Sequence, residues 1–203
     1  MYRPTKAEVL AAAGGTVPDL VGPGLRVLFC GINPSLYSSA VGYHFARPGN
    51  RFWPALHASG FTQRLLAPCE GHLLLALGCG ITNLVARASA NAAELAPGEL
   101  HAARARLERK VRRLAPRWVA VLGIGAYATT FRTPTPRVGR QEECLAGAGL
   151  WVLPNPSGLN ANHQLPELAR AFAALRVASE ATRGACGKPG LSGAVLAKLP
   201  GGA

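Results

Sequence analysis

Three short apolar runs, each ending in glycine or proline, recur along the chain. They are "LRVLFCG" at residues 25–31, "RWVAVLG" at residues 117–123 and "GLWVLP" at residues 149–154. Runs of this length, with little alternation of polar positions, are typical of strands that are buried on both faces of a parallel sheet. The pattern therefore predicts three parallel strands.

Helical patterns lie before, between and after these runs. Thr5 and Glu8 have the spacing of a capping box ahead of "VLAAA", which predicts a short first helix. In residues 97–114 the apolar side chains recur every three or four positions, and Pro97 suits a first helical turn. Further helices are expected near residues 50–60, near residues 70–78 and at about residues 166–181.

Strands that alternate with helices indicate an α/β protein. We expect a three-layer α/β/α sandwich with a central, mostly parallel sheet. Residues 1–182 are expected to form one domain, because 203 residues with 49% hydrophobic content suit a single core. Residues 183–203 are rich in glycine and small residues and are predicted to form a tail, to which no function is assigned.

The chain is strongly basic, since 22 Lys and Arg residues against ten acids give a net charge of +12. Such a charge attracts polyanions, so nucleic acid is the expected partner, although a basic surface also serves solubility or binding to anionic lipid. The Arg-rich surface of residues 97–114 fits a solvated helix face as well as a DNA-facing one. Asp19 is the single Asp in the sequence, which argues against a two-metal site built on paired Asp residues.

The cysteines are dispersed and contain no C-x-x-C pair. They are predicted to be small buried residues in a reducing compartment rather than metal ligands. The opening "MYRPTKAEV" lacks the pattern of a signal peptide, and no apolar run reaches membrane-spanning length. We expect a soluble, cytoplasmic protein without a metal or cofactor. The five cysteines are Cys30, Cys69, Cys79, Cys144 and Cys186.

Two loops carry the same tripeptide directly after a predicted strand: Asn-Pro-Ser begins at Asn33 and again at Asn155. Ligands in parallel sheets bind beyond the carboxyl ends of the strands, so both loops are candidate site segments. Near the first loop, the Asn33 amide, nearby hydroxyls and the flat ring of Phe45 are able to hold a nucleobase. After the second loop, Leu159 would stand as an apolar wedge in a DNA-binding protein. Two ordinary turns remain the alternative.

Other arrangements explain less of the sequence. Ser157 with His163 lacks the G-x-S-x-G elbow and a nearby acid that would orient the histidine. The "GIG" at residues 123–125 is an incomplete dinucleotide fingerprint. Cys69 and His72 offer two metal ligands without a second pair, and the deaminase signature is absent.

Four segments, which follow one another in a fixed order along the sequence, resemble one enzyme family. "GINPS", "GYHFARPGNRFW", "CGITNLVAR" and "WVLPNPSGLN" are similar to the mismatch-specific uracil-DNA glycosylases, the Mug and thymine-DNA glycosylase branch of the uracil-DNA glycosylase superfamily. The likeness runs from about residue 25 to residue 174. It implies a monofunctional glycosylase without a cofactor that acts as a monomer on double-stranded DNA with G:U or related mismatches. Through DNA, such a protein would be associated with the nucleoid.

The resemblance also implies roles for residues in the base pocket. Asn33 matches the asparagine that positions the attacking water, and Ile32 matches the neighbour whose backbone helps to bind the base. Phe45 matches the aromatic ring that stacks on the flipped uracil. Three further polar positions complete the implied pocket: Ser35, Ser38 and Asn83.

A second group of residues is implied to contact the DNA. Gly158, Leu159 and Asn160 match the loop that enters the duplex, where Leu159 fills the vacated space and its neighbours touch the orphaned guanine. The candidates for contacts with the DNA backbone are Ser157, Arg47 and Arg51.

One departure bears on activity. Ala93 in "NAAEL" stands where many relatives have Asp before the Glu, so the chain either shows ordinary surface drift or lacks a functional carboxylate. In the second case the fold and DNA binding would persist with low activity. A non-catalytic DNA lesion-binding protein on the same fold and a glycosylase for another damaged base are the alternatives.

Overall fold

A single sheet organises the protein, which we describe from a computed structural model over residues 2–158, 163–181 and 186. In this part of the chain the strand order is β2-β1-β3-β5-β4. All neighbouring pairs are parallel except β4 with β5, which is antiparallel. The strands are β1 (Val27–Gly31), β2 (Cys79–Asn83), β3 (Trp118–Leu122), β4 (Gly139–Leu145) and β5 (Ala148–Leu153).

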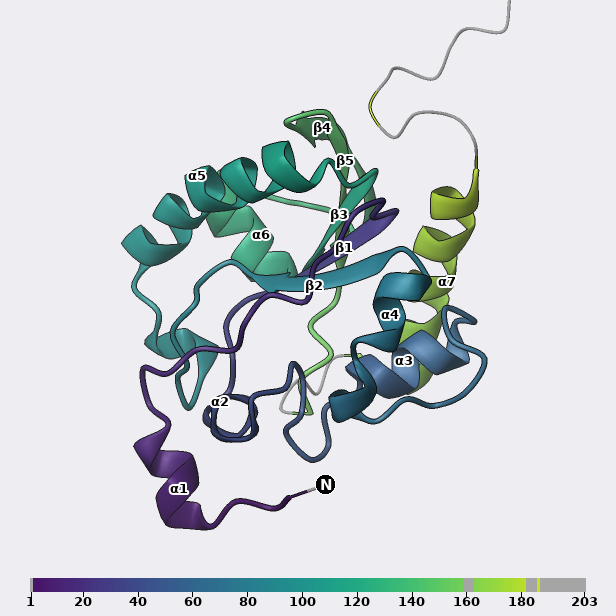
Figure 1. The fold of residues 1–203 in the computed structure, drawn as a ribbon. Coiled ribbons are helices and arrows are strands. Elements are labelled where there is room, and N and C mark those ends of the chain that lie inside the picture. Colours follow the sequence, from purple (N-terminus) through teal and green to yellow (C-terminus); the bar gives the residue numbers. More distant parts are fainter. Residues whose placement is uncertain (1, 159–162, 182–185, 187–203) are drawn as a thin grey trace, which may run out of the picture.

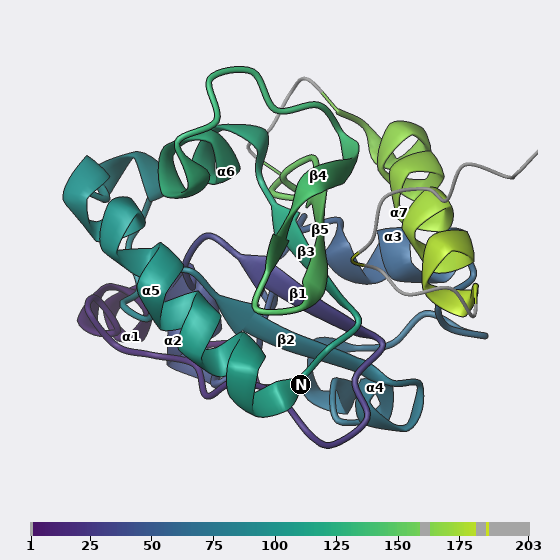
Figure 2. The same ribbon diagram turned by 90° about the horizontal axis from the view of Figure 1, so that it is seen from above.

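Helices cover both faces of the sheet (Figures 1 and 2). The helices α3, α4 and α7 pack on one face, and α5 and α6 pack on the other. The predicted α/β/α sandwich is therefore confirmed. The helices are α1 (Lys6–Ala11), α2 (Leu36–Val41), α3 (Phe52–Ala58), α4 (Leu73–Ala76), α5 (Pro97–Leu114), α6 (Ile124–Phe131) and α7 (Leu165–Glu180), with short 3₁₀ turns at η1 (Pro68–Glu70) and η2 (Ala92–Glu94).

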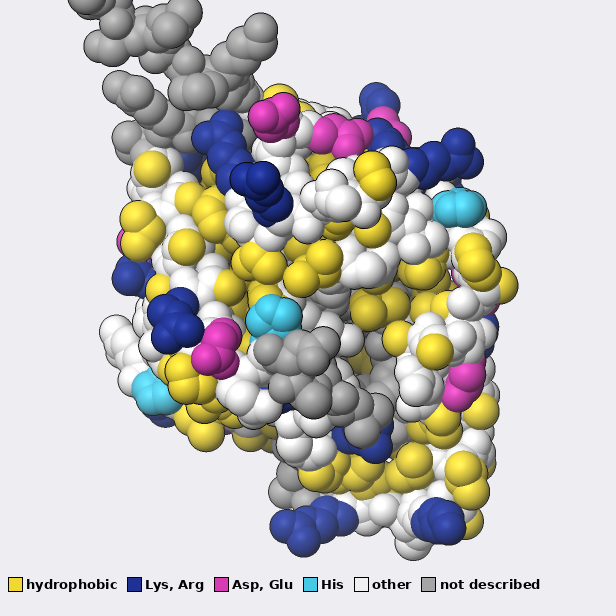
Figure 3. Space-filling model, turned by 180° about the vertical axis from the view of Figure 1, so that it is seen from behind, with side chains coloured by type: hydrophobic (Ala, Val, Ile, Leu, Met, Phe, Trp, Pro, Cys, Tyr) yellow, Lys and Arg dark blue, Asp and Glu magenta, His cyan; other side chains and the backbone are white. Residues whose placement is uncertain are grey.

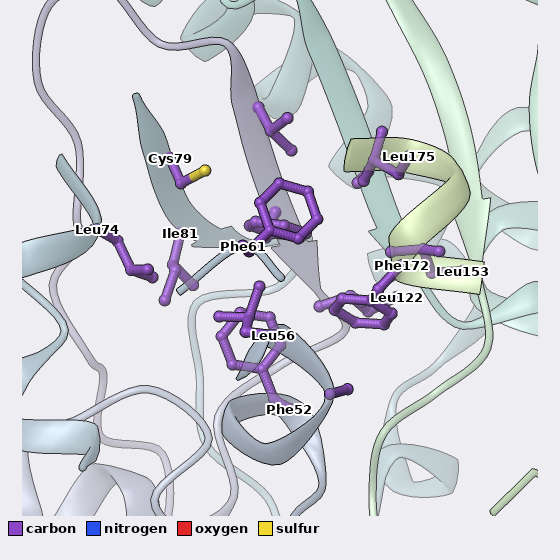
Figure 4. Packing of buried hydrophobic residues seen from close by; sticks show 14 of the residues in the cluster. Phe52, Leu56, Phe61, Leu74, Cys79, Ile81, Leu122, Leu153, Phe172 and Leu175 are labelled. Atoms are coloured by element: carbon purple, nitrogen blue, oxygen red, sulfur yellow. The ribbon is translucent and has the colours of Figure 1, made fainter. Parts of the chain in front are cut away.

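Aromatic rings fill the core between the sheet and the α3 side. Phe29 of β1 meets Phe52 edge-on, with ring centroids 5.4 Å apart, and stacks on Phe172 at 5.8 Å. Figure 4 shows Phe52, Phe172 and surrounding aliphatic side chains converging from α3, α7 and the strands. Phe52, the first residue of α3, has no exposed surface. Its packing in this core therefore fixes the position of the start of α3 and of the loop before it.

The strongest sequence patterns correspond to observed elements. The three predicted strands are confirmed as β1, β3 and β5, and the capping box of Thr5 and Glu8 begins α1. The helix predicted near residues 70–78 reduces to a 3₁₀ turn and the four residues of α4. The sequence patterns missed β2, which mixes small and polar residues, and β4, which is an edge strand with charged side chains. They also missed the short helix α2, whereas the "GIG" segment is the strand-to-helix turn from β3 to α6 that the sequence suggests.

The prediction that the five cysteines are small buried residues is wrong in two respects. Cys30 and Cys79 are buried thiols as expected, but Cys69 is only partly buried and Cys144 of β4 forms a disulfide with Cys186. The two residues are 42 positions apart in the sequence. Sequence spacing alone does not reveal such a pair. Cys186 lies in the predicted tail, so the tail is attached at this residue.

Much of the positive charge on α5 is engaged within the protein. Lys110 forms an ion pair with Asp19 at 2.7 Å and donates to Thr82 at 2.8 Å. Arg104 forms an ion pair with Glu143 of β4, and Arg112 forms one with Glu108 of α5. These contacts favour a structural role for this helix face over a DNA-facing stripe. Among the described helices, none is long and apolar enough to cross a membrane.

Leu107 tests how α5 is held on the sheet. Its side chain is almost fully buried, so Leu107→Ala is expected to lower the free energy of unfolding by about 2–5 kcal/mol. The matched control Arg109→Ala lies on the exposed side of the same helix and should change it by less than about 0.5 kcal/mol. Urea unfolding measures both. Equal effects would show that the apolar stripe does not anchor the helix.

Candidate active site

A cavity of about 540 Å³ opens where the parallel strands end. The strands β1 and β3 are neighbours at the centre of the sheet. From β1 the chain continues to β2 on one side of this pair, and from β3 it continues to β4 and β5 on the other side. This reversal leaves a crevice beyond the carboxyl ends of β1 and β3, which is the usual ligand position in such sheets. The volume lies within the range of about 300–1,000 Å³ that is common for small-molecule sites. Figure 3 shows a hollow surrounded mainly by apolar and uncharged atoms, with Lys and Arg at the margins.

The cavity brings together most of the residues that the sequence predicted. Arg51 and Gly158 lie outside its lining. Its described lining residues include no Asp or Glu, so a carboxylate base is not available among them. Of the predicted residues that the structure describes, eight line the cavity: Ile32, Asn33, Ser35, Ser38, Phe45, Arg47, Asn83 and Ser157.

The side-chain amide of Asn33 has a fixed orientation. Its Nδ2 donates to the carbonyl oxygen of Arg87 at 3.1 Å and to the hydroxyl of Ser89 at 2.8 Å. The Ser89 hydroxyl donates in turn to the carbonyl of Asn91 at 2.7 Å, so it can only accept from Asn33. Because both amide hydrogens are used, Oδ1 is the atom of Asn33 that remains to accept a hydrogen bond from a molecule in the cavity.

The loop that holds Asn33 is itself held by α5. The guanidinium of Arg87 makes two bonds of 2.7 Å to the carboxylate of Glu99, in the first turn of that helix. Glu99 also accepts from the backbone of Ala96 at the helix start. These contacts hold the pKa of Glu99 at about 2, with the Arg87 hydrogen bonds as the main cause. The acid is therefore charged at neutral pH and keeps the loop in place.

Phe45 provides a flat apolar wall of the cavity. Its ring stacks on Phe52, with centroids 4.1 Å apart and planes at 27°. Its backbone has φ 53°, a left-handed conformation that costs a bulky residue about 1–2 kcal/mol. A side chain on Gly31 would meet the Phe45 ring at 3.1 Å and would also meet Asn83. Glycine at the end of β1 thus leaves the space that these side chains border.

Asn83 lies at the end of β2, directly beside Gly31 in the parallel register. It is buried, and its Nδ2 lies 3.5 Å from the Nδ1 of His44. The other ring nitrogen of His44 lies 2.9 Å from the carbonyl oxygen of Pro18. Burial lowers the pKa of His44, so this imidazole is disposed to be neutral.

The predicted pocket hydroxyls support the walls. Ser35 is the N-cap of α2 and accepts from the backbone of Ser38 at 3.1 Å. The Ser38 hydroxyl accepts from the backbone of Ala46 at 3.1 Å, which fixes the segment that carries Phe45. With only 2% of its surface exposed, Ser38 serves chiefly to shape the cavity; its contact with a base stays a prediction.

Arg51 holds the second Asn-Pro-Ser loop. Its guanidinium donates to the carbonyl oxygens of Ser157 at 2.6 Å and His163 at 2.8 Å, on either side of residues 159–162. A side chain on Gly158 would meet the carbonyl oxygen of Gly49 at 2.6 Å, so this loop packs closely on the segment before Arg51. The contact of Arg51 with DNA phosphate stays a prediction. The predicted wedge residues Leu159 and Asn160 lie outside the described residues.

Ala93 lies next to the cavity rather than in it. Its neighbour Ala92 is a lining residue, whereas Ala93 is exposed in the short turn η2. Its backbone N–H donates to the side chain of Asn91 at 3.0 Å. The hypothesis of a lost carboxylate therefore concerns a position at the rim of the cavity.

A comparison with protein families decides the relationship of this chain. The model described as the uracil DNA glycosylase superfamily matches residues 18–176. The chain belongs to the uracil DNA glycosylase superfamily. Members of this superfamily are glycosylases, which hydrolyse N-glycosyl bonds, so family membership supports a glycosylase with DNA as its substrate. The matched segment contains every strand described above and the whole cavity lining.

Three features of this site were not predicted from the sequence. Ser89 shows no motif signal, because one serine in a small-residue loop has no distinctive pattern. His44 lies inside the quoted motif "GYHFARPGNRFW", but its burial depends on contacts with Pro18 and Asn83. The start of α6 borders the cavity through residues 123–126. Among the residues that are described, no group of three or more His, Cys, Asp or Glu could hold a metal ion.

His44 should make stability depend on pH. Its pKa is lowered from the ordinary 6.5 by burial, so below that pH the unfolded chain binds a proton more readily than the folded protein. The free energy of unfolding is expected to fall as pH drops below about 6.5 and to level off below the folded-state pKa. Urea unfolding from about pH 8 to about pH 5 measures this. His44→Asn should remove that part of the slope, and an unchanged slope would contradict the assignment.

Proposed function

We propose that this protein is a monofunctional DNA glycosylase that excises uracil, chiefly from G:U mismatches in double-stranded DNA, and leaves an abasic site. The observation that carries the proposal is the fixed amide of Asn33, which offers its Oδ1 to a cavity walled by Phe45. The resemblance to the Mug and thymine-DNA glycosylase branch supports the preference for mismatches. Mispaired bases also cost less to extrude from the duplex than paired ones.

The cavity is suited to a flipped pyrimidine. One face of the Phe45 ring is supported by Phe52, which leaves the ring rigid for stacking on a base. Asn83 lines the same cavity, and its amide oxygen lies beside Gly31, next to the Phe45 ring. Ile32 also lines the cavity, where its backbone is expected to help bind the base.

Asn33 is proposed to hold the attacking water. Its Oδ1 accepts a hydrogen bond from that water, whose oxygen then bonds to C1′ of the sugar, keeping one hydrogen as the new hydroxyl, as the bond from C1′ to the base nitrogen breaks. The bonding electrons leave with the base, and the water's second proton passes to solvent. An amide does not titrate usefully, so Asn33 orients the water without acting as a strong base. The reaction is therefore expected to be slower than in relatives with Asp at this position.

The start of α6 is suited to the negative charge that develops on the departing base. Its first backbone N–H groups belong to residues 124–126, which border the cavity, and no side chain caps this helix start among the described residues. Backbone donors and the helix dipole at such an end stabilise anions. The same donors would suit a DNA phosphate, and the exposed Arg47 adds a positive charge at the cavity.

Binding to DNA is proposed to use the loop that contains Gly158, Leu159 and Asn160, with the wedge at Leu159 filling the vacated space. The net charge of +12 favours a polyanion. A monomer suits a protein that scans DNA for isolated lesions. Ser157 is held beside the cavity and is the described candidate on this loop for contact with the DNA backbone.

A non-catalytic lesion-binding protein is the second candidate. The lining has no described carboxylate, and the resemblance implies an Asp at the position of Ala93. Both points fit a protein that binds a flipped base but releases it slowly or not at all. A preference for a different damaged base would use the same cavity, because one methyl or hydroxyl can change the order of substrates.

Asn33 tests the proposed chemistry. Asn33→Ala is expected to lower the single-turnover rate of uracil release by at least about 100-fold while duplex binding is retained. Ser89→Ala should cause a smaller loss, about tenfold, because the amide loses one of its two partners, whereas Ser89→Thr keeps the hydroxyl and most of the rate. Quenched-flow measurement of free uracil separates the variants. Full activity in Asn33→Ala would exclude Asn33 as the water-positioning residue.

Ala93 tests whether a carboxylate has been lost. If it has, Ala93→Asp should raise the single-turnover rate on a G:U duplex, with an unchanged dissociation constant for the duplex. The control Ala105→Asp adds the same charge at an exposed position of α5 that is outside the cavity lining. Equal rates for the wild type and Ala93→Asp would identify position 93 as ordinary surface drift.

A further inference from the structure

His44 is a buried histidine whose protonation pattern is fixed by its neighbours. Only 7% of its surface is exposed. Its Nε2 lies 2.9 Å from the carbonyl oxygen of Pro18, and a carbonyl can only accept, so Nε2 must carry a hydrogen. In the neutral ring, Nδ1 is then bare and acts only as an acceptor.

This tautomer determines which end of the Asn83 amide points towards His44. The amide nitrogen of Asn83 lies 3.5 Å from the bare Nδ1, where a donor is required. The amide oxygen consequently points away from His44, towards Gly31 and the ring of Phe45. A donor on Nδ1 would favour the opposite orientation, with the amide nitrogen at the base cavity.

The surroundings keep His44 neutral and in place. Burial is the largest influence on its pKa and lowers it. The charged groups that act on the ring are Asp19 and Lys110, whose effects on the pKa are opposite, and they form an ion pair with each other at 2.7 Å. The backbone carbonyl of His44 accepts from the indole of Trp53 at 3.2 Å, which fixes the residue from the other side.

We propose that His44 is a positioning residue that sets base selectivity by orienting the Asn83 amide. This proposal rests on the proposed function, because it concerns the base that the cavity accepts. Asn83 lines the cavity, so its oxygen and its second N–H are the acceptor and the donor that this orientation leaves for a base. Uracil offers the complementary N3–H and O4, whereas cytosine offers a bare N3 and an amino group, which is the reverse pattern. The Nε2–H tautomer of His44 therefore favours uracil and rejects cytosine.

Two substitutions at His44 separate positioning from packing. His44→Asn places an amide oxygen near the position of Nδ1 and can still accept from Asn83. His44→Gln reaches the position of Nε2 and leaves Asn83 without that acceptor. The probes are duplexes with a cleavage-resistant 2′-fluorinated deoxyuridine or deoxycytidine opposite guanine. The readout is the ratio of the two dissociation constants.

In His44→Gln the preference for uracil over cytosine should fall about tenfold, which is the usual effect of one misplaced hydrogen bond. His44→Asn should retain the wild-type ratio within about threefold. Unchanged ratios in both variants, or equal losses in both, would overturn the proposal. Nitrogen NMR of the wild-type imidazole gives a test without substitution: the Nε2–H form is expected, and the Nδ1–H form would overturn it.

The binding readout is independent of cleavage. If the wild-type protein binds the uracil probe selectively but releases no uracil from ordinary DNA, the proposed catalysis fails while the role of His44 stands. If it releases uracil but the ratio does not depend on His44, only the positioning role fails.

Discussion

The orientation of one side-chain amide, that of Asn33, links the fold to its proposed chemistry. An amide has a donor end and an acceptor end, and only the acceptor end can hold a water that must attack a sugar. The protein uses both donors elsewhere, on Arg87 and Ser89, so the acceptor is left to the cavity. Those partners lie more than fifty residues further along the chain and depend on the ion pair of Arg87 with Glu99. The orientation of Asn33 therefore depends on the loop after β2 as well as on its own loop. Helix α5 contributes through Glu99, which holds Arg87 in place.

The part of the cavity that is proposed to hold the base also depends on residues of the core as well as on residues that line the cavity. The strained backbone of Phe45 persists because its ring stacks on Phe52, which has no exposed surface in the aromatic core. Gly31 leaves the space in front of that ring, and Asn83 borders it from the next strand. The core thus supplies the rigidity that a stacking surface needs, while small residues at the strand ends supply the room.

The sequence predicted the central features of the fold and the site for a physical reason. Fully buried strands and the long amphipathic helix α5 have patterns that depend on local burial alone, and Asn33 and Phe45 lie in motifs directly after a strand. Ser89, His44 and the role of Arg51 depend on partners far along the chain, so no local pattern indicates them. The disulfide from Cys144 to Cys186 was missed for the same reason, whereas the edge strand β4 was missed because its charged side chains do not give the pattern of a buried strand.

The central claim is that this member of the uracil DNA glycosylase superfamily cleaves the glycosidic bond of a mismatched uracil. The most direct measurement is a single-turnover reaction of the full chain with a duplex that contains one G:U pair, compared with the same duplex containing A:U. The account predicts free uracil and an abasic site, formed faster from G:U than from A:U. Bound duplex with no free uracil from either substrate would contradict it.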